Sequence, residues 1–387
     1  MGKYSNDLKR VIFHIDVNSA FLSWSAVKLI SEGFRDIRLV PSVVSGDPDD
    51  RRSIISAKSI PAKKLGINSA EPLSMAMRKC PNLIIVKGDW AWYKECSEAF
   101  MGICRSYSPV LQKFSIDECF LDMTFRLYGK DPVAIATKLK DEIREKLGFT
   151  VNVGIGSNKL LAKMASDFEK PDRVHTLWKD EVPTKMWSLP VRDLLWVGKK
   201  SEEKLRRYGI ETIGELARMV PGSLRNMFGT KYALQLHDNA NGIDDSPVET
   251  EASEAKSYSV ERTFERDISD PKALERVLFD EACVLARRIR KDSFRASCVS
   301  LFVKYPDFSV SSKQARVEQP TDLTAFILFA ARDLLKKVWD GHTPLRQVGM
   351  GLSCLTHEKA YQMSLFEDRD LEYYKRWDRE YDRKMEK

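Results

Sequence analysis

The amino-acid sequence predicts an α+β protein built from several domains. The chain has 387 residues, which is long for a single domain. In its first 170 residues, apolar runs and segments of helical spacing follow one another in the order βαββαβ, the order of a ferredoxin-like unit. A polar, acidic segment at residues 239–255 separates this unit and a helical region from a second α+β pattern, as expected of an interdomain linker.

The ferredoxin-like unit begins with strands and one long helix. "VIFHI" at 11–15 is an apolar run typical of a buried strand, and "LIIV" at 83–86 is another. A helix is expected between residues 89 and 106. "VLQKFSI" and "CFLDM" then predict two strands that meet at Asp117 and Glu118.

The unit closes with a helix, a strand and a second helix. Asp131 and Pro132 form an N-cap and first-turn pair, and Gly148 is the expected C-cap. "FTVNVGI" at 149–155 predicts the last strand. The apolar positions of "LLAKMASDF" at 160–168 have the spacing of an amphipathic helix.

The second half of the chain is predicted to contain a helical region followed by an α+β domain. Residues 171–240 are expected to form short helices separated by Gly and Pro. The residues that follow the linker predict a second α+β domain, with strands in "SYSVERTF", "SCVSLFVKY" and "RQVGMGLSCLT" and with helices at 271–291 and 322–338. The charged residues beyond 357 are expected to be helical or without fixed structure.

Composition narrows the class of protein. No apolar run reaches the length of a membrane-spanning helix, and the N-terminal residues lack the apolar core of a signal peptide. Seven scattered cysteines without a C-x-x-C pair indicate reduced thiols, so we expect a cytoplasmic protein without a zinc site. The net charge of +7 is compatible with a polyanionic partner.

Adjacent acids at Asp117 and Glu118 are unusual in a strand-like run. A third carboxylate, Asp16, ends the first predicted strand, which can lie beside the central hairpin of a βαββαβ sheet. Three converging carboxylates repel one another unless a cation is bound, and they suit Mg²⁺ or Mn²⁺. Either stretch alone also fits a polar turn or a strand-end cap. Together, in this element order, they favour a site for two-metal phosphoryl transfer.

These stretches resemble a known pair of motifs. "HIDVNSAF" at 14–21 and "FSIDECFLDMT" at 114–124 are similar to the two carboxylate motifs of Y-family DNA polymerases, above all the bacterial UmuC/DinB group. The resemblance implies a right-hand polymerase in which Asp16, Asp117 and Glu118 are catalytic metal ligands, assisted by the Val17 carbonyl. It divides the chain into a palm (1–21 and 78–170), fingers (22–77), a helical thumb (171–240), a linker (241–255), a little finger (256–357) and a tail (358–387).

The resemblance also implies how a nucleotide is selected. Phe21 stands where the family has an aromatic ring that blocks a 2′-hydroxyl, so Phe21 is expected to be a steric gate. Without the neighbouring motif, Phe21 would be interpreted as an aromatic core residue at the start of a helix. The family often has a second aromatic residue just before the gate, whereas this chain has Ala20.

Triphosphate binding is expected from lysines. "AKSIPAKKLGI" at 57–67 has Ile60 and Lys63 where many relatives have Tyr and Arg, so only Lys63 and the adjacent Lys64 supply charge. The resemblance makes Lys170 a triphosphate lysine, with Lys163 as a supporting charge seven residues earlier, on the same helix face. Solvated lysines, or lysines that interact with a helix dipole, are the alternative.

DNA contacts are expected from both halves. "LWVGKKSEEKLRRYGIETIGELA" at 195–217 resembles a helix–hairpin–helix, in which Lys199 and Lys200 would lie near a DNA phosphate, although Trp196 replaces the usual leading Gly. A solvated basic helix face is the alternative. "VERTF" matches the start of the family's little finger, so Arg262 is expected to contact phosphates without sequence preference.

The tail carries a short docking motif. Gln362, Leu365 and Phe366 in "QMSLF" resemble the bacterial sliding-clamp binding peptide, although motifs of this length also arise by chance.

The main hypothesis is therefore a template-directed DNA polymerase for error-prone translesion synthesis. It would add deoxynucleotides to the primer 3′-OH of primer–template DNA with two Mg²⁺ ions, or with Mn²⁺, and without proofreading. The alternatives are a catalytically weak DNA- and clamp-binding scaffold of the same fold, which Ile60 and Lys63 favour, and a nucleotidyl cyclase. Nothing in the sequence requires an oligomer, so a monomer is expected.

Overall fold

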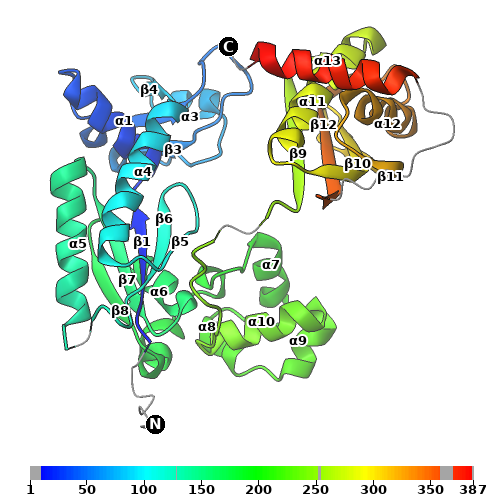
Figure 1. The fold of residues 1–387 in the computed structure, drawn as a ribbon. Coiled ribbons are helices and arrows are strands. Elements are labelled where there is room, and N and C mark those ends of the chain that lie inside the picture. Colours follow the sequence, from blue (N-terminus) through cyan, green and yellow to red (C-terminus); the bar gives the residue numbers. More distant parts are fainter. Residues whose placement is uncertain (1–9, 128, 252–253, 358–368, 386–387) are drawn as a thin grey trace, which may run out of the picture. The chain divides into compact units, whose positions relative to one another are not determined.

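The computed structural model describes residues 10–127, 129–251, 254–357 and 369–385. The chain divides into two compact units, residues 1–252 and 253–387, and each has its own sheet and hydrophobic core (Figure 1). Within the described part of the chain, every helix is too short or too polar to cross a membrane.

A five-stranded sheet forms the centre of the first unit. The strands lie in the order β5 (Leu111–Lys113), β6 (Glu118–Asp122), β1 (Ile12–Val17), β7 (Val151–Gly156) and β8 (Val174–Leu177). The first four pair antiparallel, which confirms the predicted ferredoxin-like order. β8 pairs parallel with β7, so the sheet continues past the palm boundary expected at residue 170.

Helices cover both faces of this sheet (Figure 1). α4 (Trp90–Tyr107) and α5 (Pro132–Leu147) share a core with the odd-numbered residues of β1, such as Phe13 and Ile15. α6 (Lys159–Ser166) covers the opposite face, where Ile12, His14 and Asp16 project. Because side chains alternate along a strand, Asp16 necessarily lies on the α6 face.

The ends of α5 follow the predicted capping residues. Asp131 accepts hydrogen bonds from the amides of Val133 and Ala134, and Pro132 occupies the first turn. Gly148 ends the helix at φ 73°, a left-handed conformation that glycine adopts without steric cost.

Two glycines let α6 approach β7 unusually closely. A Cβ atom at Gly154 would lie 2.0 Å from the carbonyl oxygen of Ala162, and one at Gly156 would lie 2.6 Å from the amide nitrogen of Ala162. Any larger residue would therefore push the helix off the sheet. Because of this close contact, the face of α6 that carries Lys163 lies over the end of β1.

A smaller sheet follows the first helix. α1 (Ala20–Ser31) leads into the three-stranded sheet, whose order is β3 (Ala57–Lys58), β2 (Ser42–Ser45) and β4 (Ile84–Lys87), with α2 (Ile60–Lys64) and α3 (Leu73–Lys79) between its strands. The predicted strand at 83–86 thus exists, but it pairs with β2 rather than with the central sheet. β4 therefore lies outside the residues expected to form the fingers (22–77), although it shares a sheet with β2.

Short helices complete the first unit. They are α7 (Lys199–Arg207), α8 (Ile213–Ala217), α9 (Pro221–Phe228) and α10 (Thr230–Ala240). Leu205, Ile213, Leu224 and Leu236 join them in one buried cluster that also contains Leu161 of α6. The breaks predicted from Gly and Pro correspond to the turns between these helices.

The second unit has a four-stranded antiparallel sheet in the order β11-β10-β12-β9. The strands are β9 (Ser257–Ile268), β10 (Arg295–Lys304), β11 (Val310–Thr321) and β12 (Leu345–Thr356); the helices are α11 (Pro271–Lys291), α12 (Thr324–Val338) and α13 (Arg369–Met385). β11 was not predicted. α13 is fixed by Arg290, whose guanidinium contacts Asp378 at 3.2 Å and Asp382 at 2.8 Å.

Glu281 on α11 is a buried carboxyl group without a partner. Its side chain is 1% exposed, and neither carboxylate oxygen has a hydrogen bond within the described residues. Burial raises its pKa from 4.5 to about 8, although Arg262 acts in the opposite direction. Above pH 4.5 the unfolded chain binds fewer protons here than the folded chain, so the stability contributed by this group falls as the pH rises to 8.

We therefore expect Glu281→Gln to gain stability relative to wild type as the pH rises. Between pH 5 and pH 9 the gain in free energy of unfolding should be on the order of 4 kcal/mol, because the amide does not ionise. Denaturant unfolding of the full chain at both pH values measures it. Equal differences between variant and wild type at pH 5 and pH 9 would contradict the assignment.

Candidate active site

The end of β1 brings the predicted carboxylates together. In the register of the sheet, Asp16 lies opposite Glu118 on β6 and opposite Asn152 on β7. Directly opposed residues project to the same face, so Asp16 and Glu118 are neighbours there. Asp117 precedes Glu118, and its carbonyl oxygen accepts a 3.0 Å hydrogen bond from the amide of Val17. The structure thus places all three carboxylates at one end of the sheet.

Two lysines face this cluster. Lys170 forms ion pairs with Asp16 and, at 2.8 Å, with Asp167. Lys163 Nζ lies 2.7 Å from Glu118 Oε2. These pairs connect the segment around α6 to the ends of β1 and β6. Asp167, the second acidic partner of Lys170, was not singled out from the sequence, because its neighbour Lys170 dominated that motif.

Lys163 and Lys170 do not share a helix face, contrary to their predicted spacing. α6 ends at Ser166, so Lys170 lies in the segment that follows. Two causes are visible: Pro171 disfavours a helical conformation at residue 170, and the Asn152 amide donates a 3.0 Å hydrogen bond to the carbonyl of Ser166. Lys170 reaches Asp16 from this loop.

Burial acts to raise the pKa of both Asp117 and Glu118, whereas their neighbours affect the two carboxyl groups differently. Burial, followed by the charges of Asp16 and Glu118, raises the pKa of Asp117. Burial alone would also raise the pKa of Glu118, but hydrogen bonds from His14 and Lys163 lower it to about 2. The site therefore keeps Glu118 ionised and leaves a repulsion at Asp117 that a bound cation would relieve.

The donor chemistry fits a hard divalent cation. Carboxylate oxygens are the ligands that Mg²⁺ prefers, and Glu118 Oε1 carries no hydrogen bond from any described residue. Within the same described ranges, no three His, Cys, Asp or Glu side chains form a ready-made metal cage. Asp16 and Glu118 instead form ion pairs with Lys170 and Lys163.

Aromatic neighbours fix the orientation of Phe21, which lies near the start of α1. Its ring stacks on Tyr93 with centroids 4.9 Å apart and an interplanar angle of 27°. The edges of Trp90 and Trp24 approach it at 5.3 and 5.9 Å. Ser25 Oγ donates a 2.8 Å hydrogen bond to the Phe21 carbonyl. The ring is half-buried, so one side remains available to a ligand.

The lysines of α2 are exposed. Ser59 caps this short helix by accepting a hydrogen bond from the amide of Ala62, and Lys63 and Lys64 lie on its exposed side. Neither ammonium has an ion pair with another described residue. Ile60 is 52% exposed and contributes no polar group. Both lysines are thus free to bind an anion, although the structure brings neither into contact with the carboxylates.

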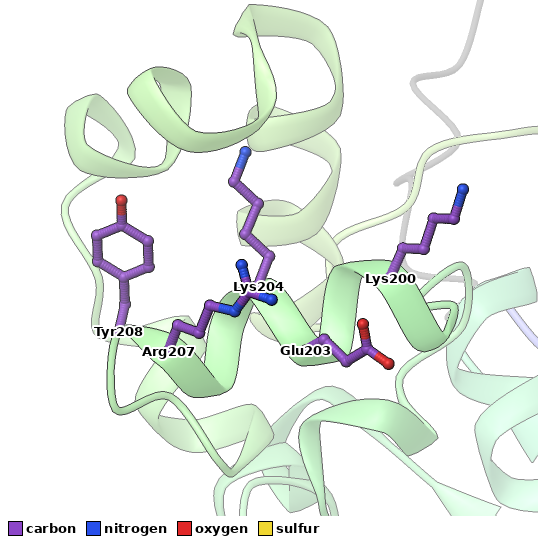
Figure 2. Close-up of a pocket in the computed structure, with 5 residues that line it drawn as sticks. All are labelled: Lys200, Glu203, Lys204, Arg207 and Tyr208. Carbon is purple, nitrogen blue, oxygen red and sulfur yellow. The ribbon is translucent and has the colours of Figure 1, made fainter.

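Basic side chains gather along α7. Lys199 and Lys200 are exposed at its N-terminus, where backbone amides also attract anions. A hollow of about 560 Å³ lies beside this helix. Figure 2 shows the five residues that line it, Lys200, Glu203, Lys204, Arg207 and Tyr208. Lys204 turns away from solvent and donates to the carbonyl of Met227.

Trp196 adopts a conformation that usually requires glycine. Its φ is 75°, in the left-handed region, which is uncommon for a bulky residue. Tyr232 donates a 2.8 Å hydrogen bond to the carbonyl of Trp196. The indole ring of Trp196 meets the ring of Phe114 edge-on, with centroids 6.3 Å apart. The hairpin therefore keeps its turn although the expected Gly is absent.

Arg262 and the tail motif complete the predicted set. Arg262 lies on β9 and contacts Asp280 on α11 at 3.2 Å, so part of its charge is already compensated. Gln362, Leu365 and Phe366 lie outside the described residues.

Three segments of this chain match known protein families. Residues 15–167 match the impB/mucB/samB family, residues 255–365 match the C-terminal domain of that family, and residues 192–244 match the thumb domain of DNA polymerase iota.

Full-length relatives and a solved structure extend these matches. The chain is 39% identical over 363 residues to DNA polymerase IV of Clostridium acetobutylicum, covering 94% of this chain and 91% of the relative. It is 34% identical over 360 residues to DNA polymerase IV 1 of Bacillus subtilis, covering 92% and 85%. The fold is similar to a Y-family DNA polymerase chimera, with a TM-score of 0.78 and 22% identity over 90% of this chain and 100% of that chain.

Proposed function

The chain belongs to the impB/mucB/samB family of Y-family DNA polymerases, and on that premise we propose how its residues share the reaction. It is a template-directed DNA polymerase of the translesion class, and its right-hand fold is that of the Y family. DNA and deoxynucleoside triphosphates are its substrates, and its reaction is metal-dependent. The convergence of Asp16, Asp117 and Glu118 at the end of β1 supports the assignment of roles that follows.

The carboxylates hold the metal ions in this proposal. Asp16, Asp117 and Glu118, with the carbonyl of Val17, bind two Mg²⁺, and Mn²⁺ can replace them. When bound, the ions lower the pKa of the primer 3′-OH and offset the charge of the triphosphate. Glu118 stays ionised for this task because His14 and Lys163 donate hydrogen bonds to it.

Three lysines bind the triphosphate. Lys170 already lies beside Asp16, and Lys63 and Lys64 are exposed with no competing ion pair among the described residues. Their ammonium groups stabilise charge that develops on the leaving pyrophosphate. A lysine is a point charge and cannot form the two-pronged contact of arginine, so this chain holds the triphosphate with less geometric constraint.

Phe21 is the steric gate, and the thumb and little finger hold the duplex. The aromatic cluster around Phe21 keeps its ring rigid enough to exclude a 2′-hydroxyl.

Lys199, Lys200 and Arg262 contact phosphates, which makes DNA binding salt-dependent and independent of sequence. In this proposal the enzyme works without proofreading, as a monomer, in the cytoplasm, where its seven free cysteines stay reduced.

Primer extension tests the assignment of the metals. With Mg²⁺ and all four deoxynucleotides, the chain should extend an undamaged primer–template, and an excess of chelator should stop it. Extension that persists in the chelator would contradict it. Binding of DNA without any extension would favour the scaffold.

Gln362, Leu365 and Phe366 bind a sliding clamp in this proposal. Replacing Leu365 and Phe366 by Ala removes the apolar side chains that would enter the clamp pocket, so clamp affinity should fall at least about a hundredfold. Clamp binding and unassisted extension are measured side by side, and extension should not change. Clamp affinity within about twofold of wild type would rule out the motif.

A further inference from the structure

His14 occupies a fully buried position directly beside the carboxylate cluster. It lies on β1, two residues before Asp16, and its side chain has no solvent exposure. Both ring nitrogens have partners from other elements: Nδ1 lies 2.8 Å from Ser166 Oγ on α6, and Nε2 lies 3.1 Å from Glu118 Oε2 on β6. The imidazole thus spans the two elements that carry Lys163 and Glu118.

His14 and Lys163 both contact the Glu118 carboxylate from the same side. Lys163 Nζ binds the same oxygen, Oε2, at 2.7 Å, so both donors hold one side of the Glu118 carboxylate. Oε1 receives no hydrogen bond from the described residues. When Nε2–H donates to Glu118, the neutral imidazole accepts at Nδ1 the single hydroxyl proton of Ser166. The imidazole is therefore braced on the side away from Glu118.

The two donors are not equivalent. Lys163 is a flexible chain that also lies 3.6 Å from Asp167, so it supplies charge without a fixed direction. The ring of His14 cannot turn freely, because it is fully buried and both of its nitrogens have partners. Of the two donors to Oε2, the imidazole is therefore the one with a fixed position.

We propose that His14 is a positioning residue for the polymerase reaction: braced by Ser166, it orients Glu118 so that Oε1 is presented to the divalent cation. The proposal rests on the role of Glu118 as a metal ligand. A residue that fixes a metal ligand from behind raises metal affinity without touching substrate. His14 acts through Glu118 and is not itself a catalytic residue.

Two amide substitutions separate the functions of the ring nitrogens. The side-chain amide of Gln reaches the position of Nε2, whereas that of Asn reaches the position of Nδ1. His14→Gln therefore keeps a donor for Glu118, and His14→Asn keeps only the contact with Ser166. If His14 only filled the core, a donor at the position of Nε2 and a donor at the position of Nδ1 would have the same effect.

The measurements are the Mg²⁺ concentration for half-maximal primer extension, kcat, the KM for deoxynucleotide and the affinity for primer–template. We expect His14→Asn to raise the half-maximal Mg²⁺ concentration about tenfold, since one hydrogen bond to a charged group is lost, and His14→Gln to stay within about threefold. DNA affinity should be unchanged in both. Ser166→Ala, which removes the brace and leaves His14, should give an intermediate rise.

Matched controls keep the outcomes distinct. Phe120→Leu removes the ring that packs on His14 but leaves both hydrogen bonds, so it should lower thermal stability without changing the Mg²⁺ requirement. An equal Mg²⁺ requirement in wild type, His14→Asn and Ser166→Ala would overturn the proposal. So would a rise in Phe120→Leu that matches His14→Asn. Glu118→Gln tests the premise separately: if that variant keeps wild-type activity, the metal-ligand role fails instead.

Discussion

Replacing Asp16 by Asn should lower the rate of primer extension by at least about a thousandfold. Asn keeps the shape of the side chain but loses the negative charge that a divalent cation needs at the end of β1. It also removes the ion pair that holds Lys170, so the triphosphate loses a positioned cation. Affinity for primer–template should stay within about threefold, because the DNA contacts proposed for the thumb and the little finger are untouched.

Asp167→Asn is the matched control for this prediction. Asp167 also pairs with Lys170, at 2.8 Å, but it lies after α6 and not on the central sheet. Removing its charge should reduce the rate less than about tenfold, as expected for one side of a shared ion pair. Similar losses in Asp16→Asn and Asp167→Asn would mean that both act only by holding Lys170, and the metal-ligand role of Asp16 would be wrong.

Phe21→Ala should raise incorporation of ribonucleotides relative to deoxynucleotides by between about ten- and a hundredfold. The half-buried ring is held against Tyr93 and Trp90, so in wild type it cannot move aside for a 2′-hydroxyl. Its removal leaves a space larger than that group, and steric rejection of this kind amounts to about 1–3 kcal/mol. Single-nucleotide insertion with matched ribo- and deoxynucleotides measures the ratio.

Phe125→Ala controls for the loss of an aromatic ring as such. Phe125 is 80% exposed and lies in the turn after β6. Its variant should keep the wild-type selectivity. If Phe21→Ala also kept it, the gate would have to be another residue, and Phe21 would be only a core aromatic of α1.

Local signals predicted much of the fold because the structure uses them directly. The caps of α5 lie at Asp131 and Gly148, as the sequence indicates, and α11 begins at Pro271 as expected. β11 was missed because most of its residues are polar and exposed, and because β10 is its one neighbour among the described strands. The sheet to which β4 belongs was not predicted, because its partner, β2, is distant in sequence and short.

The site was predictable where one residue type carries the chemistry. The acidic pair and Asp16 stand out in strand-like runs, and Lys163 follows from charge. His14 and Asn152 were not found, although His14 lies within the motif that contains Asp16. Their roles depend on α6 crossing β7 at Gly154, and no local pattern encodes that contact.

The departures from the family pattern lie on exposed surfaces. Ile60 and Lys63 face solvent on α2, and Trp196 keeps the hairpin turn at φ 75°. None of them disturbs the carboxylates or the contacts of Lys170. The expected consequence of Ile60 and Lys63 is weaker triphosphate binding, seen as a higher KM for the nucleotide with kcat preserved.

The central claim is that three carboxylates at the end of β1 make this chain a metal-dependent polymerase. Primer extension by wild type beside an Asp117→Ala, Glu118→Ala double variant, with Mg²⁺ and all four deoxynucleotides, tests it most directly. Extension by the wild type, lost in a double variant that still folds and binds DNA, is the predicted result. Extension by the double variant at the wild-type rate would contradict it.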